Sequence, residues 1–194
     1  MARHTARMSL LALDSRWRRF NDPDRACPCC GRRFPGIFDI GFDAPDAWPH
    51  SPRPEGGEVE TDGDRLASEF ARVQGRYFLR GGLLLPLRGS DEHFAFGPWA
   101  EVPEAAFRAC LASIEDPTQP FAPADAMLAN TLPGFDDSAD TPLTVTLPDP
   151  AQRPLFTATD GPLAEAQAQG LSFDDLLDLY AAFGDDIRPH LVAD

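Results

Sequence analysis

The sequence predicts an α+β fold in which a mainly antiparallel sheet, with a central β-meander, is covered by a few helices. Strand-like segments come first along the chain and helix-like segments close it, an order typical of α+β domains. The centre carries the clearest strand pattern: three aromatic or aliphatic runs separated by glycine-containing turns. The chain has 194 residues, 43% of them hydrophobic, which is enough for one sizeable core. We therefore expect a single α+β domain over residues 27–194, preceded by an Arg-rich helical extension over residues 1–26.

Helix and strand signals in the first part of the chain are weaker than those at its centre. Leu10, Leu13 and Trp17 recur at helical spacing and predict an amphipathic helix, which the turn residues 21–24 end. Many prolines and glycines between residues 44 and 64 indicate an exposed connection. In chain order, we expect a helix over 7–20, a short strand over 37–42, the exposed connection over 44–64 and a short helix within 65–73.

The central strands and the later elements are bounded by turn residues and helix caps. Gly81-Gly82 and residues 88–91 separate the three central runs, as in a meander. Pro103 occupies a favoured first-turn position of a helix, and Ser172 with Asp175 resembles a capping box. We expect strands over 77–80, 83–87, 93–102, 126–130, 143–147 and 155–158, and helices over 103–114, 162–169 and 172–183.

Charge is divided unequally along the chain, whose net charge is −14. Residues 1–33 hold eight Arg and three Asp, a net charge of +5, whereas the remaining residues hold nine Arg and 28 acidic residues, a net charge of −19. An acidic body repels nucleic-acid phosphates and anionic lipid, so we expect neither as a partner. A basic protein would be attracted to it.

The sequence also bears on where the protein resides. Its apolar runs fall well short of the roughly 20 residues that span a bilayer, and the N-terminal pattern lacks a secretory cleavage site. Three of the four cysteines crowd into one loop, which does not resemble a disulfide framework. We therefore expect a cytoplasmic protein.

The segment Cys27-Pro28-Cys29-Cys30-Gly31 has the form of a zinc knuckle. Its candidate metal ligands are Cys27 and Cys30, with Cys29 as an alternate. Tetrahedral zinc needs four ligands, and no second Cys pair follows. The other potential ligands stand singly in the sequence: Cys110, His4, His50, His93 and His190. We therefore favour a metal-free tight turn at Gly31 and expect no cofactor; the alternative is a zinc site that a distant His or Cys completes.

Other chemistry-bearing residues have simpler interpretations. Thioredoxin-type redox chemistry is disfavoured, because the cysteine loop does not lie between a strand and a helix N-terminus. Cys110 lies on the apolar face of a predicted helix, and His93 beside a hairpin turn. The carboxylates at 136, 137 and 140 suit a solvated turn, and those at 174, 175 and 178 suit a helix N-terminus. No triad order or phosphate-binding loop is present, so we predict no catalytic residue and do not expect an enzyme.

Four aromatic residues are candidates for a binding surface. Phe94 and Phe96 alternate along a predicted strand, which indicates a core face. Trp99 has the opposite parity and Trp48 lies in the exposed connection, so these two are the candidate partner-binding residues.

Several spaced motifs together resemble one known family. They are Cys-x-x-Cys-Gly from residue 27, Arg-Gly-Gly-Leu-Leu-Leu-Pro over 80–86, Phe-Ala-Phe-Gly-Pro-Trp over 94–99, Leu-Ala-Asn-Thr-Leu-Pro-Gly-Phe over 128–135, Arg-Pro at 153–154 and Gly-Pro-Leu-Ala over 161–164. In this order they resemble the bacterial domain-of-unknown-function family number 2199, over about residues 27–180. The resemblance implies no activity, because that family has none established.

Two functional hypotheses remain. The first is a non-enzymatic acidic interaction domain, immunity- or regulator-like, that binds a basic protein partner. The second is a small zinc-binding protein or enzyme centred on Cys27–Cys30.

Overall fold

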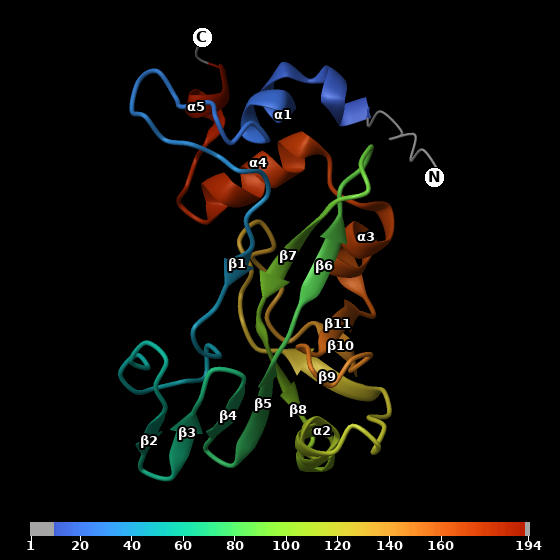
Figure 1. Cartoon of the computed structure of the whole chain (residues 1–194). Helices are drawn as coiled ribbons and strands as arrows, with labels where there is room; N and C mark the ends of the chain where they lie inside the picture. Colours follow the sequence, from blue (N-terminus) through green and yellow to red (C-terminus); the bar gives the residue numbers. More distant parts are fainter. Residues whose placement is uncertain (1–9, 193–194) are drawn as a thin grey trace.

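The computed structural model of the protein describes residues 10–192 and shows two sheets flanked by helices (Figure 1). The larger sheet has eight strands in the order β11-β10-β9-β8-β5-β4-β3-β2, and the smaller has three in the order β1-β7-β6. The strands are β1 (Ile40–Gly41), β2 (Val59–Thr61), β3 (Asp64–Leu66), β4 (Phe70–Val73), β5 (Arg76–Arg80), β6 (Leu83–Pro86), β7 (His93–Gly97), β8 (Trp99–Val102), β9 (Ala124–Leu128), β10 (Pro142–Thr146) and β11 (Leu155–Ala158). The helices are the 3-10 turn η1 (Leu10–Leu13), α1 (Ser15–Phe20), α2 (Glu104–Glu115), α3 (Gly161–Gln169), α4 (Phe173–Ala182) and α5 (Arg188–Val192).

One long antiparallel ribbon joins the two sheets. Strand β6 pairs with β7 in the small sheet, with Leu83 opposite Phe96, and β5 pairs with β8 in the large sheet, with Arg80 opposite Trp99. The two pairings share a single register, because every pair of opposed residue numbers has the same sum. Between them, the Gly81 N–H donates to the carbonyl oxygen of Pro98 at 3.0 Å, which continues that register. The three central segments are thus strands, as predicted, but the first two lie in line instead of side by side.

Gly81 and Gly82 lie within this ribbon, between β5 and β6, instead of forming a turn. A Cβ at Gly81 would lie 2.4 Å from the ring of Phe156 and 2.7 Å from the carbonyl oxygen of Pro154. The Gly82 N–H donates to that same Pro154 carbonyl oxygen at 2.8 Å, and the Phe156 N–H donates to the Gly82 carbonyl oxygen at 2.8 Å. The absence of side chains therefore lets β11 approach the ribbon closely where it passes from one sheet to the other.

Apolar side chains gather on both faces of the large sheet. The main core includes the fully buried Leu79, Ala100 and Cys110 and continues into the small sheet through Phe94 and Phe96. A second, smaller core on the opposite face contains Leu66, Ala71, Val73, Phe78 and Trp99. Alternation along the strands explains the division, because successive residues of a strand point to opposite faces.

The N-terminal helix α1 and the C-terminal helices meet at one end of the molecule (Figure 1). Trp17 and Phe20 of α1 are buried and lie against Phe173 of α4, with ring centroids 5.1 and 5.7 Å away. The Tyr180 ring of α4 stacks on Phe38 with centroids 4.0 Å apart. Aromatic residues of α1 and α4 thus form one cluster together with Phe38.

The predicted fold class is confirmed: the protein is α+β, with mostly antiparallel sheets and an N-terminal helical piece. Among the described residues, no helix is long and apolar enough to cross a membrane. The expected N-terminal helix begins only at Ser15, where the Asp14 side chain accepts from the Arg16 N–H; residues 7–9 lie outside the described range.

Two predicted elements differ from the structure. The connection over 44–64 contains the strand β2 and the buried first residue of β3, Asp64. Residues 65–73 form parts of β3 and β4 instead of a short helix. Leu66, Phe70 and Val73 recur at helical spacing, yet Leu66 and Val73 lie in the second core while Phe70 packs against the main one. A turn at Gly63, with φ +85°, precedes β3, and a turn at Gly75, with φ +77°, follows β4. The helical spacing of the apolar residues does not reveal these turns.

Candidate metal centre

The cysteine loop is a tight knuckle closed by backbone hydrogen bonds. The Cys27 N–H donates to the Arg32 carbonyl oxygen at 2.8 Å, and the Gly31 N–H donates to the Cys27 carbonyl oxygen at 2.8 Å. Gly31 has φ +75°, a conformation that suits glycine, and a bridge between Ala26 and Arg33 closes the loop. These constraints direct the three cysteine side chains toward one place.

Helix α5 supplies a fourth group to this place. Its Leu191 and the preceding Ile187 are fully buried, which anchors the helix on the core. An Arg25 guanidinium nitrogen donates to the His190 carbonyl oxygen at 3.0 Å, so the cysteine loop also holds the backbone of the helix. His190 thereby faces the three cysteines, although about 160 residues separate it from them in the sequence.

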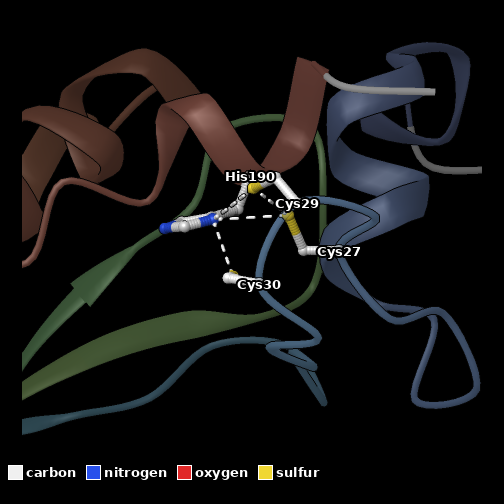
Figure 2. A group of neighbouring side chains, drawn as sticks. All are labelled: Cys27, Cys29, Cys30 and His190. Carbon is white, nitrogen blue, oxygen red and sulfur yellow. Dashed lines mark hydrogen bonds between the residues drawn. The ribbon is translucent and has the colours of Figure 1, made fainter.

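Figure 2 shows the three cysteine side chains around one ring nitrogen of His190. The His190 Nδ1 lies 3.4 Å from the Cys27 Sγ, 3.4 Å from the Cys30 Sγ and 3.9 Å from the Cys29 Sγ. The sulfurs of Cys27 and Cys29 are 3.0 Å apart, and all four donor atoms lie within 4.8 Å of one another.

This spacing resembles the edges of a metal tetrahedron. With Zn–S bonds of about 2.3 Å and Zn–N bonds of about 2.0 Å, a tetrahedral zinc separates two sulfurs by about 3.8 Å and a sulfur from a nitrogen by about 3.5 Å. The three sulfur–nitrogen distances lie close to the second value. The 3.0 Å between the Cys27 and Cys29 sulfurs is shorter than the first value, so these two side chains would move apart to bind one ion. It far exceeds the roughly 2.05 Å of a disulfide, and all four cysteines are free thiols. The cluster could therefore hold a metal ion.

The electrostatics of the thiols favour a ligand role over a nucleophilic one. Hydrogen bonds from Cys29 and His190, and from the backbone N–H groups of Cys29 and Cys30, lower the pKa of Cys27 to about 6. The neighbouring Cys27 raises the pKa of Cys29 to about 11. Cys27, whose thiolate is favoured, is buried, whereas Cys29 is exposed. A reactive cysteine needs a low pKa and solvent access in the same thiol. In this loop, one thiol has the low pKa and another has the solvent access.

Arginines surround the cluster and connect its two halves. Both terminal nitrogens of Arg32 donate to the carboxylate of Asp185, at 2.6 and 2.5 Å, and lower the pKa of that carboxyl group. The Arg32 guanidinium also lies over the Phe34 ring at 4.6 Å, and the Phe34 ring is 6.0 Å from that of His190. The cysteine loop and the segment before α5 are thus held together by groups that do not themselves bind a metal.

The structure brings together all three cysteines considered from the sequence, including Cys29, and adds His190. Sequence reasoning missed His190 because a histidine alone in a short terminal helix carries no ligand spacing. The signal that was available is the number of ligands: a knuckle with three cysteines lacks one donor, and a distant histidine can supply it. Within residues 10–192, no other group of three or more potential ligands converges in this way.

The remaining candidate residues lie elsewhere. Cys110 is fully buried in the main core, as expected, and burial raises its pKa to about 11. Trp99, considered as a partner-binding residue, is also fully buried, and its indole N–H donates to the Phe42 carbonyl oxygen at 3.0 Å. Its ring is therefore a core element and is not offered to a partner. Trp48 is half-buried against the ring of His50, with centroids 4.8 Å apart.

The acidic groups at the start of α4 act as expected. Ser172 and Asp175 form a capping box: the Asp175 N–H donates to the Ser172 hydroxyl at 3.1 Å, and the Ser172 N–H donates to the Asp175 carboxylate at 2.7 Å. Asp174 pairs with Arg16 at 2.7 Å, and Asp178 with Arg188 at 2.7 Å. These contacts give the carboxylates structural roles.

A sequence profile described as "Uncharacterized protein conserved in bacteria (DUF2199)" matches residues 26–171. The chain belongs to this family. The match includes the three cysteines of the knuckle and ends before His190. No curated protein and no solved structure matches the chain.

Proposed function

We propose that the protein binds zinc through Cys27, Cys29, Cys30 and His190, in a site of the structural type. The single observation that carries this proposal is the convergence of four donor atoms, three sulfurs and one nitrogen, within 4.8 Å of one another. Three thiolates and one imidazole are a common tetrahedral zinc set, and soft sulfur ligands disfavour magnesium and calcium.

A structural role fits the number of ligands better than a catalytic role. Catalytic zinc usually keeps one position open for water or substrate, whereas four protein ligands close the coordination sphere. The ligands come from an N-terminal loop and the last helix, so zinc would cross-link the two ends of the chain. We propose this cross-link as the function of the site.

Metal analysis of the purified protein tests the proposal. We expect one equivalent of zinc in the parent, and its loss in a Cys30→Ser, His190→Ala double variant. Cys110→Ser with His93→Ala is the matched control, because it removes the same two residue types elsewhere and should leave zinc bound. Cobalt substitution adds a spectroscopic check, since thiolate-to-cobalt charge transfer reports the sulfur ligands. Parent protein free of metal after purification under reducing, chelator-free conditions would contradict the proposal.

The acidic body supports a second proposal, a non-enzymatic interaction domain that binds a basic protein. Two adjoining hollows between α3, α4 and the segment 134–141 share Gly134, Phe135 and Pro162. They are lined by five carboxylates and no arginine: Asp136, Asp137, Glu165, Asp175 and Asp178. Asp175 and Asp178 pair with arginines outside the hollows, and the other three are exposed.

Pull-down at low and high salt tests this second proposal. A specific basic partner should bind at low salt and dissociate at high salt, because exposed charges are screened. The variant Asp137→Asn, Glu165→Gln should weaken capture, whereas Glu55→Gln, Asp125→Asn, with the same charge change elsewhere, should not. Absence of a specific, salt-sensitive partner would count against it.

A further inference from the structure

A groove of about 520 Å³ lies between α2 and the strands β3, β4 and β5. It is at the opposite end of the molecule from the cysteine loop and α5 (Figure 1). Helix α2 packs against β5 and leaves the neighbouring β3–β4 part of the same sheet face uncovered. The volume suits a small organic ligand, because such pockets typically measure about 300–1,000 Å³.

Three aromatic side chains form the apolar side of the groove. Phe107 of α2 lies against Phe70 and Tyr77 of the sheet, with ring centroids 5.8 and 5.1 Å away. All three rings remain half-buried, as does Leu111 on the next turn of α2. The rings thus offer a partly open apolar wall on which a planar group can pack.

Arginines line the other side, and two of them lie opposite each other on neighbouring strands. Arg65 and Arg72 lie directly opposite each other on β3 and β4, and like charges at opposed positions destabilise a sheet. Arg65 has an ion pair with Glu58 and lies opposite Glu60. Within residues 10–192, the Arg72 guanidinium has no ion pair with a carboxylate: it donates to the Gly63 carbonyl oxygen at 2.8 Å and attracts the Asp64 carboxylate over a longer distance.

The groove has three guanidinium groups, two of which already have carboxylate partners. Arg108 of α2 is the third guanidinium and pairs with Glu104 at 2.6 Å, as Arg65 pairs with Glu58. Glu60 and Glu115 line the groove as well, so among the described residues of the lining Arg72 is the one guanidinium without an ion pair. An anion beside Arg72 would offset the repulsion between the opposed arginines.

We infer that this groove binds a small organic anion with a planar apolar body, whose carboxylate or phosphate group pairs with Arg72 while the body packs on Phe70, Tyr77 and Phe107. The inference is independent of the zinc proposal, because no residue of the groove contacts the cysteine loop. The two head groups share one chemistry, a planar or tetrahedral set of oxygens that a guanidinium binds through paired N–H groups.

Titration with matched probes tests the inference. The probes are 2-naphthoate, 2-naphthyl phosphate and the neutral 2-naphthamide, which share one ring system; binding is followed by calorimetry and by amide chemical shifts. We expect at least one anion to bind about tenfold more tightly than the amide, as a charge-assisted hydrogen bond allows. The shifts should cluster on α2, β4 and β5, and the tighter anion identifies the preferred head group.

Two groove variants and one control decide whether Arg72 is responsible. Arg72→Gln should weaken anion binding about tenfold and leave amide binding unchanged, and Arg108→Gln should weaken it less. Arg76→Gln is the control, because Arg76 is an exposed arginine on the neighbouring strand that does not line the groove. Circular dichroism and the urea midpoint verify that each variant folds. Equal affinity for anions and amide, an equal effect of Arg72→Gln and Arg76→Gln, or no binding at millimolar concentration would each overturn the inference.

Discussion

Helix α5 should depend on metal for its attachment. Ordering its five residues together with the preceding Ile187 costs about 1–2 kcal/mol each, or about 6–12 kcal/mol in total. Burial of Ile187 and Leu191 returns about 1.5–3 kcal/mol each. Hydrogen bonds from Arg25 to the His190 carbonyl oxygen and from Arg19 to the Leu191 carbonyl oxygen add about 1 kcal/mol each. These opposing contributions nearly cancel, so without metal the helix should open readily.

Zinc bound as proposed would shift this balance by linkage. Free zinc at 100 times its dissociation constant stabilises the bound form by about 2.7 kcal/mol, which corresponds to roughly 100-fold slower local opening. Hydrogen exchange at the amides of His190 and Leu191 should slow by about this factor when zinc is added to chelated protein. Amides of α3 serve as an internal reference, because that helix contributes no ligand.

A pair of histidine variants separates metal binding from general stability. His190→Ala should abolish zinc-dependent protection of α5, whereas His93→Ala, at an exposed position in β7, should retain it. If the α5 amides of the parent exchange at the same rate with and without bound zinc, the metal does not hold the helix and this reasoning fails.

Three further changes probe the fold. Tyr180→Phe should destabilise the protein by about 1–3 kcal/mol in urea unfolding, because the hydroxyl donates to the Phe38 carbonyl oxygen at 2.9 Å and accepts from the Phe38 N–H at 3.1 Å; an unchanged midpoint would contradict this. Gly81→Ala should cost roughly 2–3 kcal/mol by the same assay, since a Cβ would meet an aromatic ring of β11 at 2.4 Å, and wild-type stability would refute the close approach. The Gln74 N–H lowers the pKa of Asp64, so the stability that this carboxylate contributes is present above about pH 4 and lost as the pH falls through its depressed pKa. Asp64→Asn should reduce this loss of stability at acid pH. An unaltered dependence of stability on pH would contradict the prediction.

Local patterns in the sequence identify many of the elements. Residues 155–158 form a strand as predicted, because turn residues bound a short apolar run. Helix α4 begins where its cap predicts, since Ser172 and Asp175 act within a few residues of each other. The part of the candidate metal centre that lies in one loop is visible for the same reason. All of these signals are local.

Long-range pairing is not visible in this way. Gly81-Gly82 has the composition of a turn, yet strand pairing continues through it, and the glycines instead allow Phe156 and Pro154, far along the chain, to approach closely. Leu66, Phe70 and Val73 match a helical face, yet their burial on two sides of a sheet depends on neighbouring strands. His190 meets the cysteines only because α5 is anchored by Ile187 and Leu191.

Because one ribbon joins the two sheets, the strand register in one sheet fixes the strand register in the other. Because β5–β8 and β6–β7 keep one pairing frame, inserting or deleting a residue within either arm would offset both sheets at once. Side chains that now point inward, such as Phe94 and Leu79, would then turn toward solvent at both ends of the molecule. Changes in length should be tolerated only at the tip, residues 88–91, beyond the pairing of Leu87 with Glu92, where the chain reverses direction and the frame is not interrupted.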